Sequence, residues 1–222
     1  MNYLAHARPY LDDPYRVAGT ALPDWMNVID RRNKARRSRA EAMLADGSHD
    51  PSLMAVARGC VQHHLDDAWF HQQSQFASLC THFAVQLRRF LGIDQGHQRG
   101  FVGHIVIELL LDAVLVERDS QLLDRYYAAL QAIDPQRIVA AANLICIRPA
   151  PALQELIPRF IEVRFLEDYT SDTRLLYRLN GVMRRIGFPS LPPELTEWLS
   201  HARGVVRDAA DDLLSPPGDV PR

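Results

Sequence analysis

The sequence has few cysteines, almost no excess of charge of either sign and no long uninterrupted apolar run. Its three cysteines among 222 residues, Cys60, Cys80 and Cys146, form no Cys-x-x-Cys pair, which excludes a disulfide scaffold and a cysteine-rich zinc module. Their odd number and scattered positions favour a reduced cytoplasmic protein with buried thiols. The formal net charge of −2 and the lack of a helix-turn-helix signature argue against nucleic-acid binding.

Signals for secretion and for a membrane span are also lacking. The N-terminal stretch MNYLAHARPYLDD has no basic region followed by an apolar one, so no signal peptide is expected. The longest apolar stretch, 101–116, is interrupted by His104, Glu108 and Asp112 and is too short and too polar to span a bilayer. We therefore expect a soluble intracellular protein without a transmembrane segment.

What the sequence does contain is a series of helix signals. Asp50-Pro51 and Asp134-Pro135 each place an N-capping acid before a proline at the first helical position, and glycines at 47, 92 and 187 supply helix ends. Strand signals are scarce, and Asn180-Gly181 lies inside a helical pattern. The patterns predict helices over 2–11, 14–30, 34–46, 51–72, 74–91, 96–117, 119–132, 135–147, 151–168, 171–186 and 193–213.

These helices predict an all-α fold in a single domain, residues 1–214, whose last part is a C-terminal helical extension. The segment SPPGDVPR, residues 215–222, is rich in proline and is predicted to be a flexible tail. A domain boundary near 149–151 is the alternative.

One predicted helix buries polar groups in an apolar surrounding. In FVGHIVIELLLDAVLVERD, residues 101–119, the polar positions His104, Glu108 and Asp112 are spaced at i, i+4 and i+8 and share one face. A buried carboxylate is costly unless it is paired, protonated or bound to a metal. This face is therefore a hydrogen-bonded core trio, a stripe facing solvent, or one wall of a metal site.

A second helix shows the same spacing. In GCVQHHLDDAWFH, residues 59–71, the residues His63, Asp67 and His71 fall on one stripe, whereas His64 and Asp66 are expected to point elsewhere. The helical rise of ~1.5 Å per residue separates His63 from His71 by ~12 Å, so one ion is shared more easily by His63 and Asp67. Such ligands suit Zn²⁺, Mn²⁺ or Fe²⁺. The alternative is a surface hydrogen bond between the two side chains.

The N-terminal region adds two candidate ligands. His6 lies in the apolar segment MNYLAH, and Asp24 lies between Pro23 and Trp25. The alternative for Asp24 is a helix N-cap. The adjacent pair His49-Asp50 is better explained by the N-cap role of Asp50 than by metal binding.

Three segments together resemble acyl carrier protein phosphodiesterases. They are MNYLAH, AGTALPDWM and GCVQHHLDDAWFH, which are similar to the family's Met-Asn-aromatic-Leu-Ala-His start, its small-residue run ending in an acid, and its Gly-x₃-His-x₃-Asp-Ala-aromatic helix. The segment GHIVIELLLDAVL resembles the family's next helix, and the likeness covers about the first 130 residues. It implies an HD-domain-like helical bundle and metal or catalytic roles for His6, Asp24, His63 and Asp67.

The family's activity, as the resemblance implies it, depends on a divalent ion (Mn²⁺, Zn²⁺, Fe²⁺ or Mg²⁺). It cleaves the phosphodiester between phosphopantetheine and a serine of the carrier protein. In this interpretation His63 and Asp67 hold the ion, and His6, Asp24 or His104 completes the metal site. The residues His71, His64 or Glu108 then act as a general acid or as extra ligands.

The chain also departs from the family pattern. It has His64 and Leu65 where the family has basic residues, His71 where the family has an acid, and Glu108 near a usual basic position. These changes suggest another small phosphodiester substrate, more than one metal ion, or a site like that of zinc-dependent phospholipases C. A non-catalytic helical binding module with a vestigial metal site is the competing class.

A basic segment predicts the surface that meets a partner. RRNKARRSR, residues 31–39, has six basic residues in nine, and acyl carrier proteins are acidic. We expect Arg36 and Arg37 to contribute to docking of such a carrier. The alternative is a solvated helix end.

Overall fold

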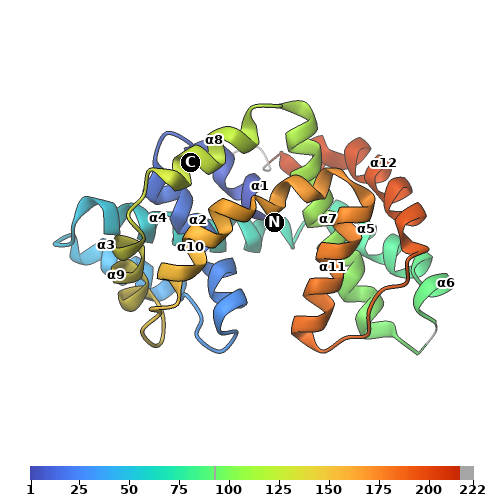
Figure 1. The fold of residues 1–222 in the computed structure, drawn as a ribbon, viewed down its shortest axis with the longest axis horizontal. Helices are drawn as coiled ribbons and strands as arrows, with labels where there is room; N and C mark the ends of the chain where they lie inside the picture. Colours follow the sequence, from blue (N-terminus) through green and yellow to red (C-terminus); the bar gives the residue numbers. More distant parts are fainter. Residues whose placement is uncertain (93, 216–222) are drawn as a thin grey trace. The chain divides into compact units, whose positions relative to one another are not determined.

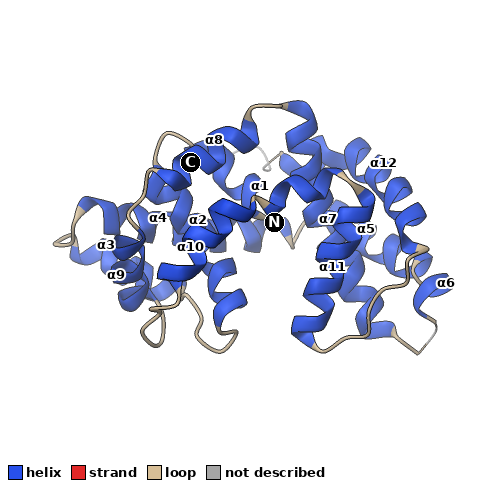
Figure 2. Ribbon diagram, viewed as in Figure 1, coloured by secondary structure: helices blue, strands red, loops and turns tan. Residues whose placement is uncertain are grey.

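The computed structural model describes residues 1–92 and 94–215, and within them every regular element is a helix (Figures 1 and 2). The predicted all-α fold is confirmed, and among these residues the β-type pairing is one isolated bridge, Ala35 with Cys146. The α-helices are α1 Tyr3–Ala7, α2 Pro14–Ile29, α3 Arg37–Asp46, α4 Pro51–Phe70, α5 Ser74–Gln86, α6 Arg88–Leu91, α7 Gly96–Arg118, α8 Leu122–Gln131, α9 Pro135–Ile145, α10 Leu153–Val163, α11 Asp172–Ile186 and α12 Leu195–Leu214, with 3₁₀ segments η1 Arg8–Tyr10 and η2 Phe165–Thr170.

Local sequence signals set most helix ends. The Asp50 carboxylate accepts a hydrogen bond from the Ser52 amide at 2.9 Å, and the Asp134 carboxylate accepts one from Gln136 at 2.9 Å, as N-caps do. Glycines 47, 92 and 187 have φ of 68°, 77° and 80°, a region that favours glycine and closes α3, α6 and α11. The predicted N-caps and glycine stops are therefore confirmed.

Three predicted helices are each divided in the structure. The range 2–11 becomes α1 and η1, 74–91 becomes α5 and α6, and 151–168 becomes α10 and η2. The last division follows from Arg164, which takes a left-handed conformation with φ 46° and ends α10. The Asn180-Gly181 pair lies within α11, as the helical pattern predicts.

The chain divides into two compact units. The first comprises Met1, Tyr3–Ala68 and Gln121–Arg164, and the second comprises Asn2, Trp69–Ser120 and the chain from Phe165 onward. The divisions fall after residues 68, 120 and 164, away from 149–151, and one of them lies within α4. The prediction of one domain over 1–214 stays a prediction, and residues 216–222 of the predicted tail lie outside the described residues.

In the first unit, α2 is the central helix and packs against α1, α8, α9 and α10. The Trp25 ring of α2 is fully buried, with its centroid 5.5 Å from that of Phe160 on α10. Tyr3 of α1 meets the same Phe160 ring at 5.1 Å. This aromatic core fixes the short helix α1, which carries His6, against the rest of the unit.

Two glycines let α2 and α4 approach at backbone distance. A Cβ atom on Gly59 would lie 2.2 Å from the carbonyl oxygen of Arg16, and one on Gly19 would lie 2.3 Å from that of Val56. No larger residue fits either position without moving a helix. The crossing places α4 beside the backbone carbonyl of Thr20 on α2, which His63 of α4 contacts.

In the second unit, α7 is the buried helix and packs against α5, α12 and η2. Glu108 is 8% exposed and Asp112 is fully buried, while apolar neighbours such as Ile107 and Leu110 are fully buried as well. The structure confirms the buried helix predicted over 101–116.

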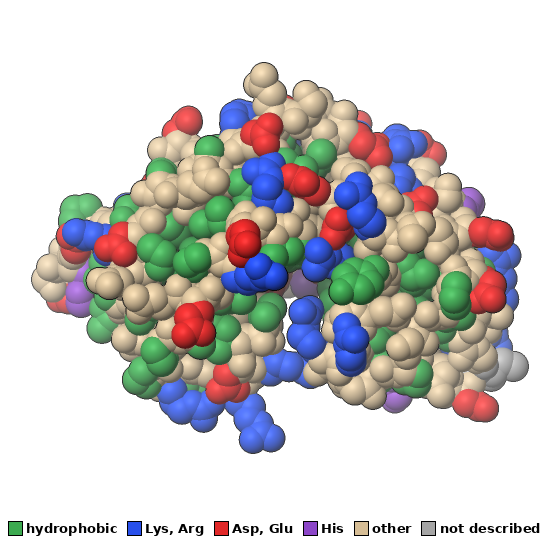
Figure 3. Space-filling view, viewed as in Figure 1, with side chains coloured by type: hydrophobic (Ala, Val, Ile, Leu, Met, Phe, Trp, Pro, Cys, Tyr) green, Lys and Arg blue, Asp and Glu red, His purple; other side chains and the backbone are tan. Residues whose placement is uncertain are grey.

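The prediction of buried thiols is confirmed for Cys60 and Cys146, whereas Cys80 is only partly buried. Cys60, Cys80 and Cys146 are all free thiols, and burial raises the pKa of Cys60 to about 12. Figure 3 shows basic and acidic side chains interspersed on the face in view. Among the described residues, no helix combines the length and the apolar character that crossing a membrane requires.

Candidate metal centre

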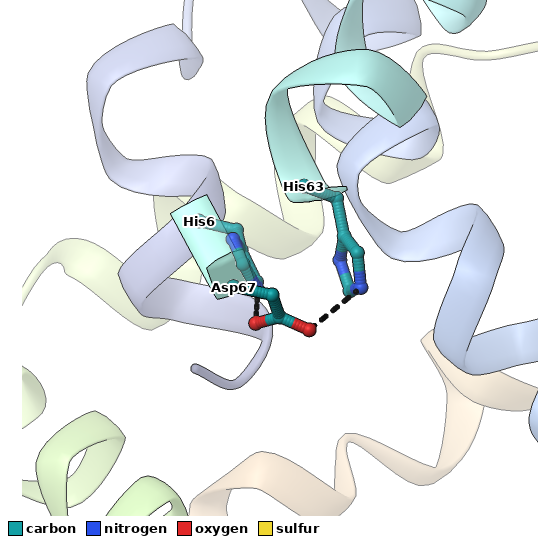
Figure 4. A group of neighbouring side chains, drawn as sticks. All are labelled: His6, His63 and Asp67. Carbon is teal, nitrogen blue, oxygen red and sulfur yellow. Dashed lines mark ion pairs between the residues drawn. The ribbon is translucent and has the colours of Figure 1, made fainter. Parts of the chain in front are cut away.

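Helices α1 and α4 bring His6, His63 and Asp67 together (Figure 4). The His6 Nε2 atom lies 3.3 Å from Asp67 Oδ1, and the His63 Nε2 atom lies 3.4 Å from Asp67 Oδ2. Both histidines are buried, at 1% and 4% exposure. One nitrogen from each ring and one carboxylate oxygen all lie within 4.8 Å of one another, so one ion could contact all three.

The outer ring nitrogen of each histidine is held by an acceptor. His6 Nδ1 lies 3.1 Å from Asp66 Oδ2, and His63 Nδ1 lies 2.9 Å from the Thr20 carbonyl oxygen. Because an ionised carboxylate and a carbonyl only accept hydrogen bonds, each Nδ1 carries the proton and donates it. The Nε2 atoms are then the nitrogens that face Asp67. Metal-ligating histidines are held by a carboxylate or backbone carbonyl in this way.

The charges in the cluster suit a cation. Burial and the neighbouring His6 lower the pKa of His63 well below its ordinary value, so this ring is neutral. Burial acts to raise the pKa of Asp67, but the His6 contact, the Met1 amino group 2.7 Å away and His63 lower it well below its usual range. Burial acts to lower the pKa of His6, but Asp66 and Asp67 outweigh it and raise that pKa to about 9.

The residues present therefore fit a divalent ion. The His63 Nε2 lone pair faces an ionised oxygen of Asp67 at 3.4 Å, an arrangement of two electron-rich atoms that a cation would stabilise. The buried His6 Nε2 atom has Asp67 Oδ1 at 3.3 Å as its partner, and this contact is an ion pair when the ring carries its second proton. A divalent ion would take the place of the proton that His6 otherwise holds there.

Asp24 does not join this cluster. It lies in the middle of α2, which begins at Pro14 with Asp13 as its N-cap, so the alternative of Asp24 as an N-cap is wrong. The cause is Pro23, which α2 accommodates inside the helix rather than at a helix start. Its role as a ligand stays a prediction.

The second unit contains another convergent group. His71 Nε2 lies 2.9 Å and His104 Nε2 lies 3.0 Å from the same oxygen, Oε1 of Glu108. Burial acts to raise the pKa of Glu108, but hydrogen bonds from His104 and His71 help to hold it below its ordinary value. The predicted ligand His104 thus belongs to a group with His71 and Glu108, and His63 and His71 belong to different groups.

The remaining candidates have local roles. His64 Nε2 lies 3.1 Å from the Ala35 carbonyl oxygen, and burial lowers its pKa. Arg36 and Arg37 are exposed at the start of α3, where Arg37 Nε lies 2.7 Å from Glu41 Oε1.

The sequence prediction that Asp66 points away from the site is wrong, because α1 packs on the side of α4 where Asp66 reaches His6 Nδ1. Thr20 was also missed, since it contributes a backbone carbonyl that no side-chain pattern reveals. The adjacent pair Asp66-Asp67 is the sequence signal that points to Asp66. One acid of such a pair can bind the metal while its neighbour accepts a hydrogen bond from a histidine ligand.

Comparison of the chain with protein-family models, with curated proteins and with solved structures gives no match. The family resemblance that rests on His6, Asp24, His63 and Asp67 therefore stays a prediction.

Proposed function

We propose that this chain is a divalent-metal-dependent phosphodiester hydrolase and that its substrate resembles that of acyl carrier protein phosphodiesterases. The observation that carries the proposal is the convergence of two histidine Nε2 atoms on the Asp67 carboxylate, with each Nδ1 held by a second acceptor. This convergence supports metal binding. The resemblance of the three N-terminal motifs supports phosphodiester cleavage, with release of phosphopantetheine from a carrier-protein serine.

The ligand set favours an ion that accepts imidazole nitrogen. Two histidine nitrogens and one carboxylate oxygen are typical of Zn²⁺, Mn²⁺ or Fe²⁺ sites, whereas Mg²⁺ prefers oxygen ligands alone. When bound, such an ion acidifies water and offsets the negative charge of a phosphoryl group.

The protein's own residues would orient the site and move a proton. Asp66 and Thr20 fix the rotation of the His6 and His63 rings, so that both Nε2 atoms stay aimed at one point. His64 is a proton-transfer candidate in the same unit, with its ring centroid 5.5 Å from that of His63. Because its Nε2 donates to the Ala35 carbonyl, its Nδ1 is the nitrogen that can accept a proton.

The proposal predicts activity that depends on added metal. Full-length protein stripped with a chelator should not hydrolyse bis-p-nitrophenyl phosphate, and addition of Mn²⁺ or Zn²⁺ should restore hydrolysis. The same reloaded protein should release phosphopantetheine from a phosphopantetheinylated acyl carrier protein, measured by mass spectrometry of the carrier. Hydrolysis of the small ester without cleavage of the carrier would support the hydrolase activity and overturn the proposed carrier-protein substrate. No hydrolysis of either substrate by metal-loaded protein would overturn the proposed function.

Carrier docking gives a second prediction. The double substitution Arg36→Gln/Arg37→Gln should weaken binding of an acidic acyl carrier protein several-fold at low salt, because two exposed positive charges are removed. The difference should shrink at high salt, where exposed charges are screened. Affinity is measured by fluorescence anisotropy of a labelled carrier. Arg159→Gln, an exposed arginine of the same unit, is the matched control and should bind as the unaltered protein does; equal affinities of all three proteins at low salt would contradict the docking role.

A site like that of zinc-dependent phospholipases C is the second candidate function. The observation that favours it is the additional group of nitrogen and oxygen donors at His71, His104 and Glu108. Cleavage of a phospholipid headgroup ester by the metal-loaded protein, with no action on a carrier protein, would select this function.

A further inference from the structure

We infer that His71, His104 and Glu108 form a second metal site, independent of the first, that binds Zn²⁺. The inference goes beyond the proposed function because it requires neither phosphodiester turnover nor any ligand of the first centre. All three residues lie in the second unit.

The geometry brings three donors to one point. His104 and Glu108 stand one helical turn apart on α7, and His71 follows α4 directly. Both Nε2 atoms lie at 2.9 and 3.0 Å from Glu108 Oε1, and one ligand atom from each residue lies within 4.8 Å of the others. Three protein ligands with at least one open position are the arrangement of catalytic zinc sites, among which His₂Glu is a known set.

The two rings are held in this orientation by packing. Their centroids are 4.8 Å apart, and the Phe76 ring lies 5.2 Å from His71 and 5.0 Å from His104. The ring centroid of Phe70, the last residue of α4, lies 5.7 Å from that of His71. The packing of these aromatic rings therefore holds both imidazoles in the orientation in which they contact Glu108.

The composition of the group exceeds what a structural ion pair requires. One protonated imidazole would balance the charge of Glu108, whose side chain is 10% exposed. The second imidazole adds a donor to the same oxygen. Replacement of the two Nε2 protons by one Zn²⁺ would satisfy all three groups together.

The site is open to solvent on the histidine side. The side chains of His71 and His104 are 34% and 39% exposed, in contrast to the Glu108 side chain beneath them. An ion can therefore reach the three donors and keep positions for water or another ligand. Two nitrogens and one carboxylate select Zn²⁺ over Mg²⁺ and Ca²⁺, which take oxygen ligands.

The test counts Zn²⁺ bound to the full-length protein. Chelator-stripped protein is titrated with Zn²⁺, excess ion is removed by gel filtration, and the metal retained per chain is measured by mass spectrometry. We expect two ions for the unaltered protein, one for His71→Gln/His104→Gln, one for Asp67→Ala and none for the combination. An excess of Mg²⁺ should displace neither ion.

Two controls keep the result interpretable. His82→Gln removes an exposed histidine of α5 in the same unit and should leave two ions bound. The partly exposed histidines are varied rather than buried Glu108, and far-UV circular dichroism verifies the fold of each variant.

The inference is overturned if His71→Gln/His104→Gln retains as many ions as the unaltered protein, or if all the metal disappears with Asp67→Ala. Loss of one ion with the histidine variant sustains it even when the protein hydrolyses no phosphodiester, so its failure and that of the proposed function are distinguishable.

Discussion

Replacing Asp67 by alanine is expected to remove the metal ion of the first centre and to lower kcat/KM for phosphodiester hydrolysis by at least about 10³-fold. A loss of that size corresponds to about 4 kcal/mol of transition-state stabilisation. Asp67 is the group that both histidine Nε2 atoms face, at 3.3 and 3.4 Å. Without its carboxylate two neutral donors remain, which hold a divalent ion poorly. Metal content and turnover are measured on the same preparation.

Two other acids of the first unit provide graded comparisons for this substitution. Asp66→Asn keeps the direct ligands but weakens the contact to His6 Nδ1, so metal affinity or activity should fall by about 10- to 100-fold. Asp12→Asn alters an exposed acid of the same unit and should change neither. Full metal occupancy together with full activity in Asp67→Ala would show that this carboxylate is not a ligand.

The fold was predictable where helix ends are encoded locally. The capping acids Asp50 and Asp134 bind the amide two residues further on, and the terminal glycines 47, 92 and 187 act through their own conformation. Neighbouring sequence therefore suffices to place them. Helix division at Arg164 was not predictable in this way. A left-handed arginine has no sequence signature, because its conformation is set by the surrounding packing.

The site was predictable where its members are close in sequence and not where they are far apart. His63 and Asp67 are one helical turn apart, so spacing alone placed them together. His6 is a candidate because of its apolar segment and the family resemblance, and no spacing links it to the site, since its contact with Asp66 joins residues 60 positions apart. Choosing between the adjacent acids Asp66 and Asp67 required the packing of α1 on α4, which periodicity does not contain.

The position of His71 illustrates the same limit. The predicted helix over 51–72 placed His71 on the stripe of His63 and Asp67, but α4 ends at Phe70 and His71 lies in the turn that follows. Its ring therefore does not follow the helical spacing of His63 and Asp67, and it contacts Glu108 of α7 instead. One residue at a helix end thus decided which group His71 joins, and helix ends are where periodicity is least informative.

Replacing Gly59 by alanine is expected to lower the free energy of unfolding by about 3 kcal/mol, because the added methyl group overpacks a backbone contact. The new Cβ would lie 2.2 Å from the Arg16 carbonyl oxygen and 2.7 Å from the Thr20 amide nitrogen. Both atoms belong to the backbone of α2, so neither can move aside as a side chain would. The two helices must separate, and urea unfolding measures the cost.

A glycine without neighbours is the matched control. Gly181 lies inside α11, and nothing lies within 4 Å of a Cβ atom placed there. Gly181→Ala should therefore leave stability unchanged or raise it by up to about 1 kcal/mol, from helix propensity alone. Equal unfolding free energies for Gly59→Ala and the unaltered protein would show that α2 and α4 can part without cost.

The Gly59→Ala substitution should also weaken metal binding at the first centre. Gly59 precedes His63 by one helical turn, and the His63 Nδ1 atom depends on the Thr20 carbonyl of α2 at 2.9 Å. Separation of the helices lengthens that hydrogen bond and frees the ring to rotate. Folded Gly59→Ala protein should consequently bind the ion of the first centre about 10-fold more weakly or worse, whereas Gly181→Ala should bind it as the unaltered protein does. Glycine at this crossing is then a requirement of the site as well as of the fold.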